Sequence, residues 1–177
     1  MQTFIELALR RRSIRKYEDK PVEDEKIKTI LQAGLASPSS KHLNPWEFVV
    51  VTDKEILKKM SSCRTYGSSM LAHSPLGIAV CLDASLTDTW QCDGAIAALN
   101  MLLCAEDLGL GGCWVQVNGR SLSDDETTTA DEYIRSLVGI PDNLTVLCIV
   151  SIGYKAEEKK PINTEKLQYE KIHYGKY

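Results

Sequence analysis

Residues 89–117 read TWQCDGAIAALNMLLCAEDLGLGGCWVQV, and this stretch decides the fold. Its apolar residues extend over about Thr89–Leu108, which predicts the longest helix of the chain. Several small residues on this helix allow a second helix to pack close to it: Gly94, Ala95, Ala97 and Ala98. Glycines at positions 109, 111 and 112 then end the helix, and Cys113–Val117 is typical of a strand. A long apolar helix followed by a strand is consistent with an α+β domain.

The segments on either side of this stretch alternate between helix and strand patterns. Short apolar runs predict three further strands, at Trp46–Val51, Leu76–Leu82 and Leu144–Ile152. Further helices are predicted at residues 3–11, from the acidic turn after Pro21 to Ser37-Pro38, at about Lys54–Ser61, and from Ser123 to Gly139-Ile140-Pro141. Ser123 and Glu126 have the spacing of a capping box. No repeat or flexible linker interrupts this order, so one α+β domain is expected over residues 1–177.

The composition excludes several classes of protein. Hydrophobic residues at 44% and charged residues at 25% are ordinary for a globular chain of 177 residues. A net charge of −3 argues against a protein that coats nucleic acid or an anionic membrane. The longest apolar stretch, Ala95–Ala105, is too short to span a bilayer, and Met1–Leu9 lacks the apolar core of a signal peptide. A cytoplasmic protein is therefore expected.

The cysteines and histidines do not form a recognisable metal or hydrolase site. The six cysteines contain no CxxC pair and no metal-ligand spacing with a histidine. Cys81, Cys104 and Cys148 lie within apolar runs, where a thiol behaves as a small hydrophobe. Buried structural thiols in a reducing compartment are expected, with no metal. His73 is interpreted as a loop or helix-end residue.

Residues 10–16, RRRSIRK, form a cationic segment with two open interpretations. Cations at the end of a helix complement its dipole, and this role needs no ligand. In an extended stretch, however, Arg11, Ser13 and Arg15 point to one side. Two guanidinium groups and a hydroxyl suit a phosphate monoester. The chain has no glycine-rich phosphate loop, so side chains would have to bind the phosphate.

Several segments, in this order along nearly the whole chain, resemble the nitroreductase family. They are RRSIRKY at 11–17, PSS at 38–40 with NPW at 44–46, WQCD at 90–93, LGLGGCW at 108–114, and IGY at 152–154 followed by a basic tail. The resemblance implies a three-layer α-β-α fold with a central mixed, largely antiparallel sheet. It also implies a homodimer with FMN at each subunit interface.

The resemblance further implies an FMN-dependent oxidoreductase. Such an enzyme transfers hydride from NAD(P)H, through flavin N5, to nitroaromatics, quinones or similar electron-poor acceptors. The flavin carries the chemistry, so no catalytic nucleophile, acid or base is expected from the protein. The implied partners are a second subunit, NAD(P)H and a small acceptor, without nucleic acid or a membrane.

The FMN contacts that the resemblance implies come from four parts of the chain. Arg11 and Ser13 would address the phosphate and ribityl chain, and Arg15 would lie near the pyrimidine edge. A cation at that edge would stabilise the negative charge of the reduced flavin. The remaining contacts would be Arg12 beside them, Pro38, Ser39, Ser40 and Asn44 from the loop of the other subunit, Gln116 and Val117 at flavin N5 through a backbone N–H, and Lys166 at the phosphate.

Three positions depart from the family pattern close to the reacting ring. His42 replaces the usual asparagine, Asn44 replaces glutamine, and Val117 stands where glycine is common. His42 is interpreted as a possible gate or proton donor. Residues 62–69 lack the lysine that some relatives place beside the pyrimidine, and Ser69 is the nearest equivalent. These departures leave the acceptor open.

Other interpretations of the same residues remain. A flavin-sequestering protein with little turnover, or a structural dimer with a basic helix end, would carry the same cationic segment. Reductive dehalogenation or another flavin reaction on the same scaffold is a further alternative, although no long lid insertion is recognisable between Ser62 and Leu110. Asp93 and Asn100 are expected to serve in capping or interhelical hydrogen bonds rather than as an acid pair.

Overall fold

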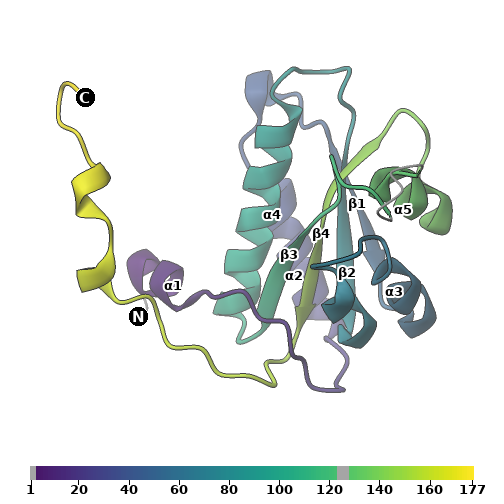
Figure 1. Cartoon of the computed structure of the whole chain (residues 1–177), viewed down its shortest axis with the longest axis horizontal. Coiled ribbons are helices and arrows are strands. Elements are labelled where there is room, and N and C mark those ends of the chain that lie inside the picture. The colour runs from purple at the N-terminus through teal and green to yellow at the C-terminus, as the bar shows by residue number, and fades with distance from the viewer. Residues whose placement is uncertain (1–2, 123–127) are drawn as a thin grey trace.

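The computed structural model describes residues 3–122 and 128–177. Its centre is a four-stranded sheet in the order β1-β2-β4-β3 (Figure 1). The strands are β1 Trp46–Val51, β2 Leu76–Leu82, β3 Gly111–Gln116 and β4 Thr145–Gly153. Neighbouring strands are all antiparallel, and a parallel bridge joins Ser13 to Gly112 at the β3 edge. The predicted mixed, largely antiparallel sheet is confirmed.

Helices cover both faces of this sheet (Figure 1). α2 (Asp24–Leu35) and α4 (Trp90–Asp107) pack on one face, and α3 (Lys54–Met60) and α5 (Ala130–Val138) pack on the other. The side chains of β2 alternate between the two cores, as the pleat of a strand requires: Ile78, Val80 and Leu82 join α2 and α4, whereas Ala79 and Cys81 join the other layer. The predicted three-layer arrangement is therefore present. No helix in the described residues is long and apolar enough to cross a membrane.

Helix α1 (Phe4–Arg10) stands outside the three layers and is fixed by a buried carboxylate. Glu106, near the end of α4, has only 2% of its side chain exposed. It accepts hydrogen bonds from Arg10 Nε at 2.8 Å and from Lys155 Nζ at 2.7 Å. A buried carboxylate needs such partners, because an unpaired charge in the interior is costly. Glu106 thereby fixes the end of α1, where the cationic segment begins, against α4.

Most predicted boundaries lie within a residue or two of those observed, and the starts of β3 and α5 need comment. β3 begins at Gly111 rather than at Cys113, because Gly111 and Gly112 already pair with Gly153 and Ile152 of β4. The predicted capping box at Ser123 and Glu126 lies outside the described residues. α5 begins at Ala130, and its capping box is formed by Thr129 and Glu132.

The cysteines follow the expectation except on α4. All six are free, and Cys63, Cys81, Cys113 and Cys148 are buried. Cys92 is exposed and Cys104 is half-buried, so the expected burial was wrong for these two. Both belong to α4, on which Ile96 and Leu99 are also 39% and 48% exposed. One side of α4 therefore presents apolar groups to solvent.

After β4 the chain continues as an exposed arm, residues 160–177, that projects past α1 (Figure 1). The arm contains two single turns of 3-10 helix, η3 (Thr164–Lys166) and η4 (Tyr169–Lys171). Its start is held to α1 by the Ile162 N–H, which donates to Leu9 O at 2.9 Å. Its large apolar side chains are exposed: Ile162, Leu167, Tyr169, Ile172, Tyr174 and Tyr177. Such a contiguous apolar segment is typical of a surface that contacts another molecule.

Candidate functional site

The cationic segment runs in extended conformation along the edge of β3. Ser13 bridges to Gly112, and the Ile14 N–H donates to Gly112 O at 3.0 Å. Ile14 is buried, at 2% exposure, between the flanking Ser13 and Arg15. The approach is so close that a Cβ on Gly111 would lie 2.6 Å from Ile14 Cγ1. Glycine at 111 therefore allows the segment to lie against the strand, and of the two open interpretations the structure shows the extended one around Ser13.

A lysine of the tail lies beside the cationic segment at the beginning of β3. Lys159 Nζ donates to Ser13 O at 2.7 Å. Burial raises the pKa of the Cys113 thiol, and the nearby charges of Arg15, Lys159 and Arg11 oppose that rise together with a hydrogen bond to Ser13. The Arg11 guanidinium, the Lys159 ammonium and the Ser13 hydroxyl form a donor set suited to a dianionic phosphate ester.

The beginning of the tail holds this segment in place. Glu157 Oε1 accepts the backbone N–H of Arg15 at 2.6 Å and that of Lys16 at 3.2 Å. Lys159 Nζ donates to Ser13 O at 2.7 Å, and the Arg12 guanidinium donates to Lys160 O. Arg12 is thus engaged with the tail.

Lys159 contacts the cationic segment and was not predicted from the sequence, because the lysine-rich tail has no periodic pattern that distinguishes one lysine from another. The resemblance pointed to Lys166 instead. Lys166 ends η3 on the exposed arm, beyond the point at which the arm leaves the body.

The second predicted segment, the loop from Pro38 to Asn44, lies against the other end of α4. The Ser40 N–H donates to Asp93 Oδ1 at 3.0 Å, and Asn100 Nδ2 donates to Ser37 Oγ at 2.8 Å. These bonds agree with the hydrogen-bonding role expected for Asp93 and Asn100. Within the loop, Ser39 Oγ donates to Asn44 Oδ1 at 2.8 Å and accepts the Asn44 N–H at 3.0 Å. The two predicted contact residues Ser39 and Asn44 therefore close the loop on itself.

One chain does not bring these two segments together. The loop contacts Asp93 in the first turn of α4, whereas the end of α1 contacts Glu106 in its last turn. More than three helical turns separate the two positions, a distance of about 20 Å along the helix axis. The cationic segment and the loop thus lie at opposite ends of the same helix.

The third predicted segment lies at the end of β3 and is held rigidly. Gln116 Oε1 accepts from Trp114 Nε1 at 2.9 Å, and Gln116 Nε2 donates to Asn118 O at 2.9 Å. The Val117 N–H donates to Leu147 O at 3.1 Å. The backbone donor of Val117 is therefore already used inside the fold.

A cation that the sequence analysis missed lies beside this segment. Arg64 donates through one guanidinium nitrogen to Gln116 O at 3.1 Å. Arg64 lies within residues 62–69, where some relatives place a lysine beside the pyrimidine and where Ser69 was the predicted equivalent. The arginine at 64 was the signal available in the sequence, and Ser69 instead begins the 3-10 turn η2 (Ser69–His73).

The nitroreductase family model matches residues 8–63 and 64–154, which include the cationic segment, the loop and the end of β3. This chain belongs to the nitroreductase family.

Solved and curated relatives cover almost all of this nitroreductase-family chain. The structure of an FMN-dependent nitroreductase from Clostridium difficile R20291 matches with a TM-score of 0.95 and 46% identity, over 98% of this chain and 100% of that one. A protein of Archaeoglobus fulgidus, provisionally named an NADH dehydrogenase or NAD(P)H nitroreductase, is 40% identical over 90% of this chain and 89% of its own length. The NADPH-flavin oxidoreductase of Vibrio harveyi is 32% identical over 91% of this chain and 70% of its own length.

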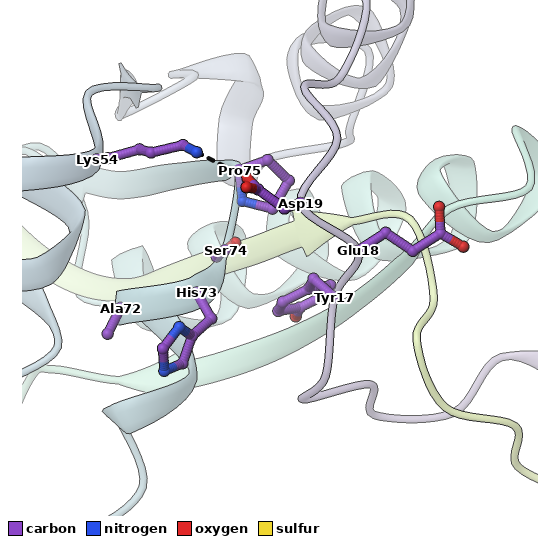
Figure 2. A pocket seen from close by; sticks show the side chains of 8 residues that line it. All are labelled: Tyr17, Glu18, Asp19, Lys54, Ala72, His73, Ser74 and Pro75. Carbon is purple, nitrogen blue, oxygen red and sulfur yellow. Dashed lines mark hydrogen bonds and ion pairs between the residues drawn. The ribbon is translucent and has the colours of Figure 1, made fainter.

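A separate hollow of about 360 Å³ in this nitroreductase-family chain lies near Tyr17 and does not include the predicted site residues (Figure 2). Figure 2 shows Lys54 reaching toward Asp19, and their charged groups pair at 2.7 Å. The Tyr17 hydroxyl is directed inward, where it donates to Ile14 O at 2.7 Å. His73 ends η2 beside the hollow, in agreement with the helix-end position expected for it.

Proposed function

We propose that the protein is an FMN-dependent NAD(P)H oxidoreductase that works as a homodimer and reduces nitroaromatics, quinones or similar electron-poor acceptors. The observation that carries this proposal is the cationic segment at the edge of β3, where Ser13 bridges to Gly112 and Lys159 Nζ donates to Ser13 O at 2.7 Å. The names of the relatives, which are nitroreductases and a flavin oxidoreductase, support the same chemistry.

The donor set fits the phosphate end of FMN. Arg11, Ser13 and Lys159 would hold the phosphate, since a dianion pairs best with several cationic donors at once. Arg15, two residues beyond Ser13 along the segment, would lie toward the flavin ring. This division of roles separates an anchor for the phosphate from a cation that acts on the ring.

The remaining half of the site would come from a second copy of the chain. In one chain, the loop from Pro38 to Asn44 contacts α4 about 20 Å along the helix axis from the point at which the end of α1 contacts it. An isologous dimer brings different parts of two copies together at two equivalent places. The exposed apolar side of α4 and the exposed arm supply the surface for that contact.

When bound, FMN would supply the redox chemistry between NAD(P)H and the acceptor. The side chain of Arg15 would stabilise negative charge that develops on the reduced cofactor. The rigid strand end at Gln116 and Val117 orients the ring, with Gln116 rather than Val117 as the backbone donor, since the Val117 N–H is bound to Leu147 O. His42, exposed at the end of the loop, gates the site or donates a proton to the reduced acceptor. Six free thiols suit the reducing cytoplasm, where we place the protein.

The visible spectrum of the purified protein tests this proposal. A yellow preparation with flavin bands is expected, whereas a colourless protein that takes up no added FMN would overturn it and favour a structural dimer. Stopped-flow bleaching by NADH and by NADPH then identifies the donor. A protein that holds flavin but is bleached by neither would be a sequestering module.

A further inference from the structure

Asp93 is a buried carboxylate with only one of its oxygens bonded. Its side chain lies in the first turn of α4 and the residue is 4% exposed. Oδ1 accepts the Ser40 N–H at 3.0 Å. Oδ2 is buried and has no hydrogen-bond partner among the described residues. Leaving such an atom unpaired reduces stability, and a native protein that retains one usually does so for a functional reason.

The loop that Asp93 holds is itself strained. Lys41, His42 and Asn44 have φ angles of 52°, 56° and 46°, in the left-handed region that favours glycine. Side-chain-bearing residues persist there only when their surroundings impose the conformation, and such positions concentrate at functional sites. The unpaired oxygen and the strained backbone therefore occur at one junction, where the loop meets α4.

The neighbouring contact between the loop and α4 has neither feature. Ser37 Oγ accepts from Asn100 Nδ2 at 2.8 Å and donates to Ala33 O at 3.2 Å. Ser37 continues directly from α2 and lies before the left-handed residues. This contact is an ordinary structural hydrogen bond, which makes it a matched control for Asp93.

We propose that Asp93 is a positioning residue for the cofactor and acceptor site. Its bond to the Ser40 N–H keeps the loop from Pro38 to Asn44 in the strained conformation that presents His42 and Asn44 to the site, at the expense of an unpaired oxygen. The inference rests on the proposed function, since the loop lines a flavin site only in the proposed dimer. The unpaired Oδ2 distinguishes the bond from Asp93 to Ser40 from a purely structural hydrogen bond. Removing the Asp93 side chain removes a destabilising unpaired oxygen and, at the same time, the support of the loop.

The test compares Asp93→Ala, Asp93→Asn and Ser37→Ala. In Asp93→Ala the unfolding temperature of the apoprotein is expected to stay the same or rise. Hydrogen exchange at the Ser40 amide is expected to accelerate, and the Kd for FMN and the KM for the acceptor to rise about tenfold, since a bond to a charged acceptor is lost. Asp93→Asn retains an oxygen that accepts the Ser40 N–H and is expected to restore both constants. Ser37→Ala is expected to lower the unfolding temperature and leave FMN affinity unchanged.

Two results would overturn the proposal. The first is a loss of stability in Asp93→Ala that equals the loss in Ser37→Ala, with unchanged Kd and KM. The second is a Kd for FMN and a KM in Asp93→Asn that are as high as in Asp93→Ala, although the Ser40 amide of Asp93→Asn exchanges as slowly as in the wild type. If the wild-type protein binds no FMN, the proposed function fails by itself. In that case, unchanged Ser40 exchange in the apoprotein of Asp93→Ala would still show that Asp93 does not hold the loop.

Discussion

At the scale of single residues, Arg11 and Arg15 share one segment but are held by different parts of the chain. The Arg11 N–H donates to Leu7 O at the end of α1, whereas the Arg15 N–H donates to Glu157. The first arginine therefore moves with the helix and the second with the tail. We therefore expect Arg11 and Arg15 to have different roles in FMN binding.

We predict that Arg15→Ala lowers the midpoint potential of the bound flavin more than Arg11→Ala does. The reason is that a cation near the pyrimidine stabilises the reduced, more negative flavin, whereas a phosphate anchor mainly affects affinity. Arg11→Ala is expected to raise the Kd for FMN instead. Spectroelectrochemical titration and FMN titration measure the two effects. Equal changes in potential would contradict the assignment.

Glu157 gives a prediction with a defined pH dependence. The backbone hydrogen bond from Arg15 is the main reason that the pKa of Glu157 lies below its usual value of 4.5. A lowered pKa in the folded state means that the carboxylate stabilises the fold above about pH 4.5, and that this contribution disappears as the pH falls through the lower, folded-state value.

Glu157→Gln is accordingly expected to reduce the free energy of unfolding by about 1 kcal/mol at pH 7. The difference from wild type should vanish once the medium is acidic enough to protonate Glu157 in the folded protein. Denaturant titrations at several pH values measure it. Glu158→Gln, at an exposed neighbouring carboxylate, is the control. A deficit that persists unchanged in acid would show that charge at 157 is not responsible.

At the scale of elements, β3 and the cationic segment depend on the absence of a side chain at Gly111. A methyl group there would lie 2.6 Å from Ile14 Cγ1 and 2.9 Å from Lys155 Cγ. Gly111→Ala is therefore expected to push the segment off the strand, with a loss of about 1–3 kcal/mol of stability and weaker FMN binding.

Gly77→Ala is the matched control, because its Cβ would meet Leu57 Cδ2 at 2.8 Å on the α3 side of β2. It should lose stability without a change in the Kd for FMN. Thermal unfolding and FMN titration of both variants compare the two effects. Unaltered FMN affinity in Gly111→Ala would mean that close packing of the cationic segment on β3 is not needed for FMN binding.

The elements also show what the sequence could predict and what it could not. β1 and β2 have the predicted bounds, because each is a short run rich in apolar and β-branched residues that is bounded by polar residues. The beginning of β3 was missed because glycine is read as a helix stop, and its pairing with β4 is a tertiary contact. Lys159 and Arg64 were missed for the same reason, since their partners, Ser13 and Gln116, lie far away in the chain.

At the scale of the whole molecule, the separation of the two halves of the site leads to a complementation test. A variant carrying Arg11→Ala and Arg15→Ala would lack the cationic half, and Asn44→Ala would damage the loop half. If each site is built from two subunits, a mixed dimer contains one intact and one doubly damaged site. Random mixing should then recover about a quarter of the wild-type sites.

Flavin content and turnover of the unfolded and refolded mixture, compared with each variant alone, provide the measurement. No recovery, despite mass-spectrometric proof of mixed dimers, would mean that each subunit builds its own site. Mixing the cationic-half variant with itself under the same conditions controls for the refolding procedure.

The exposed arm has a consequence for the lifetime of the protein. Residues 160–177 have little to pack against in a single chain, and unstructured exposed termini are preferred points of proteolytic attack. In the proposed dimer, association would hide the arm, and the fraction of chains that are associated would rise with protein concentration. The enzyme would thus be degraded fastest when it is scarce and protected when it is abundant, so that cellular levels respond more than proportionally to the rate of synthesis.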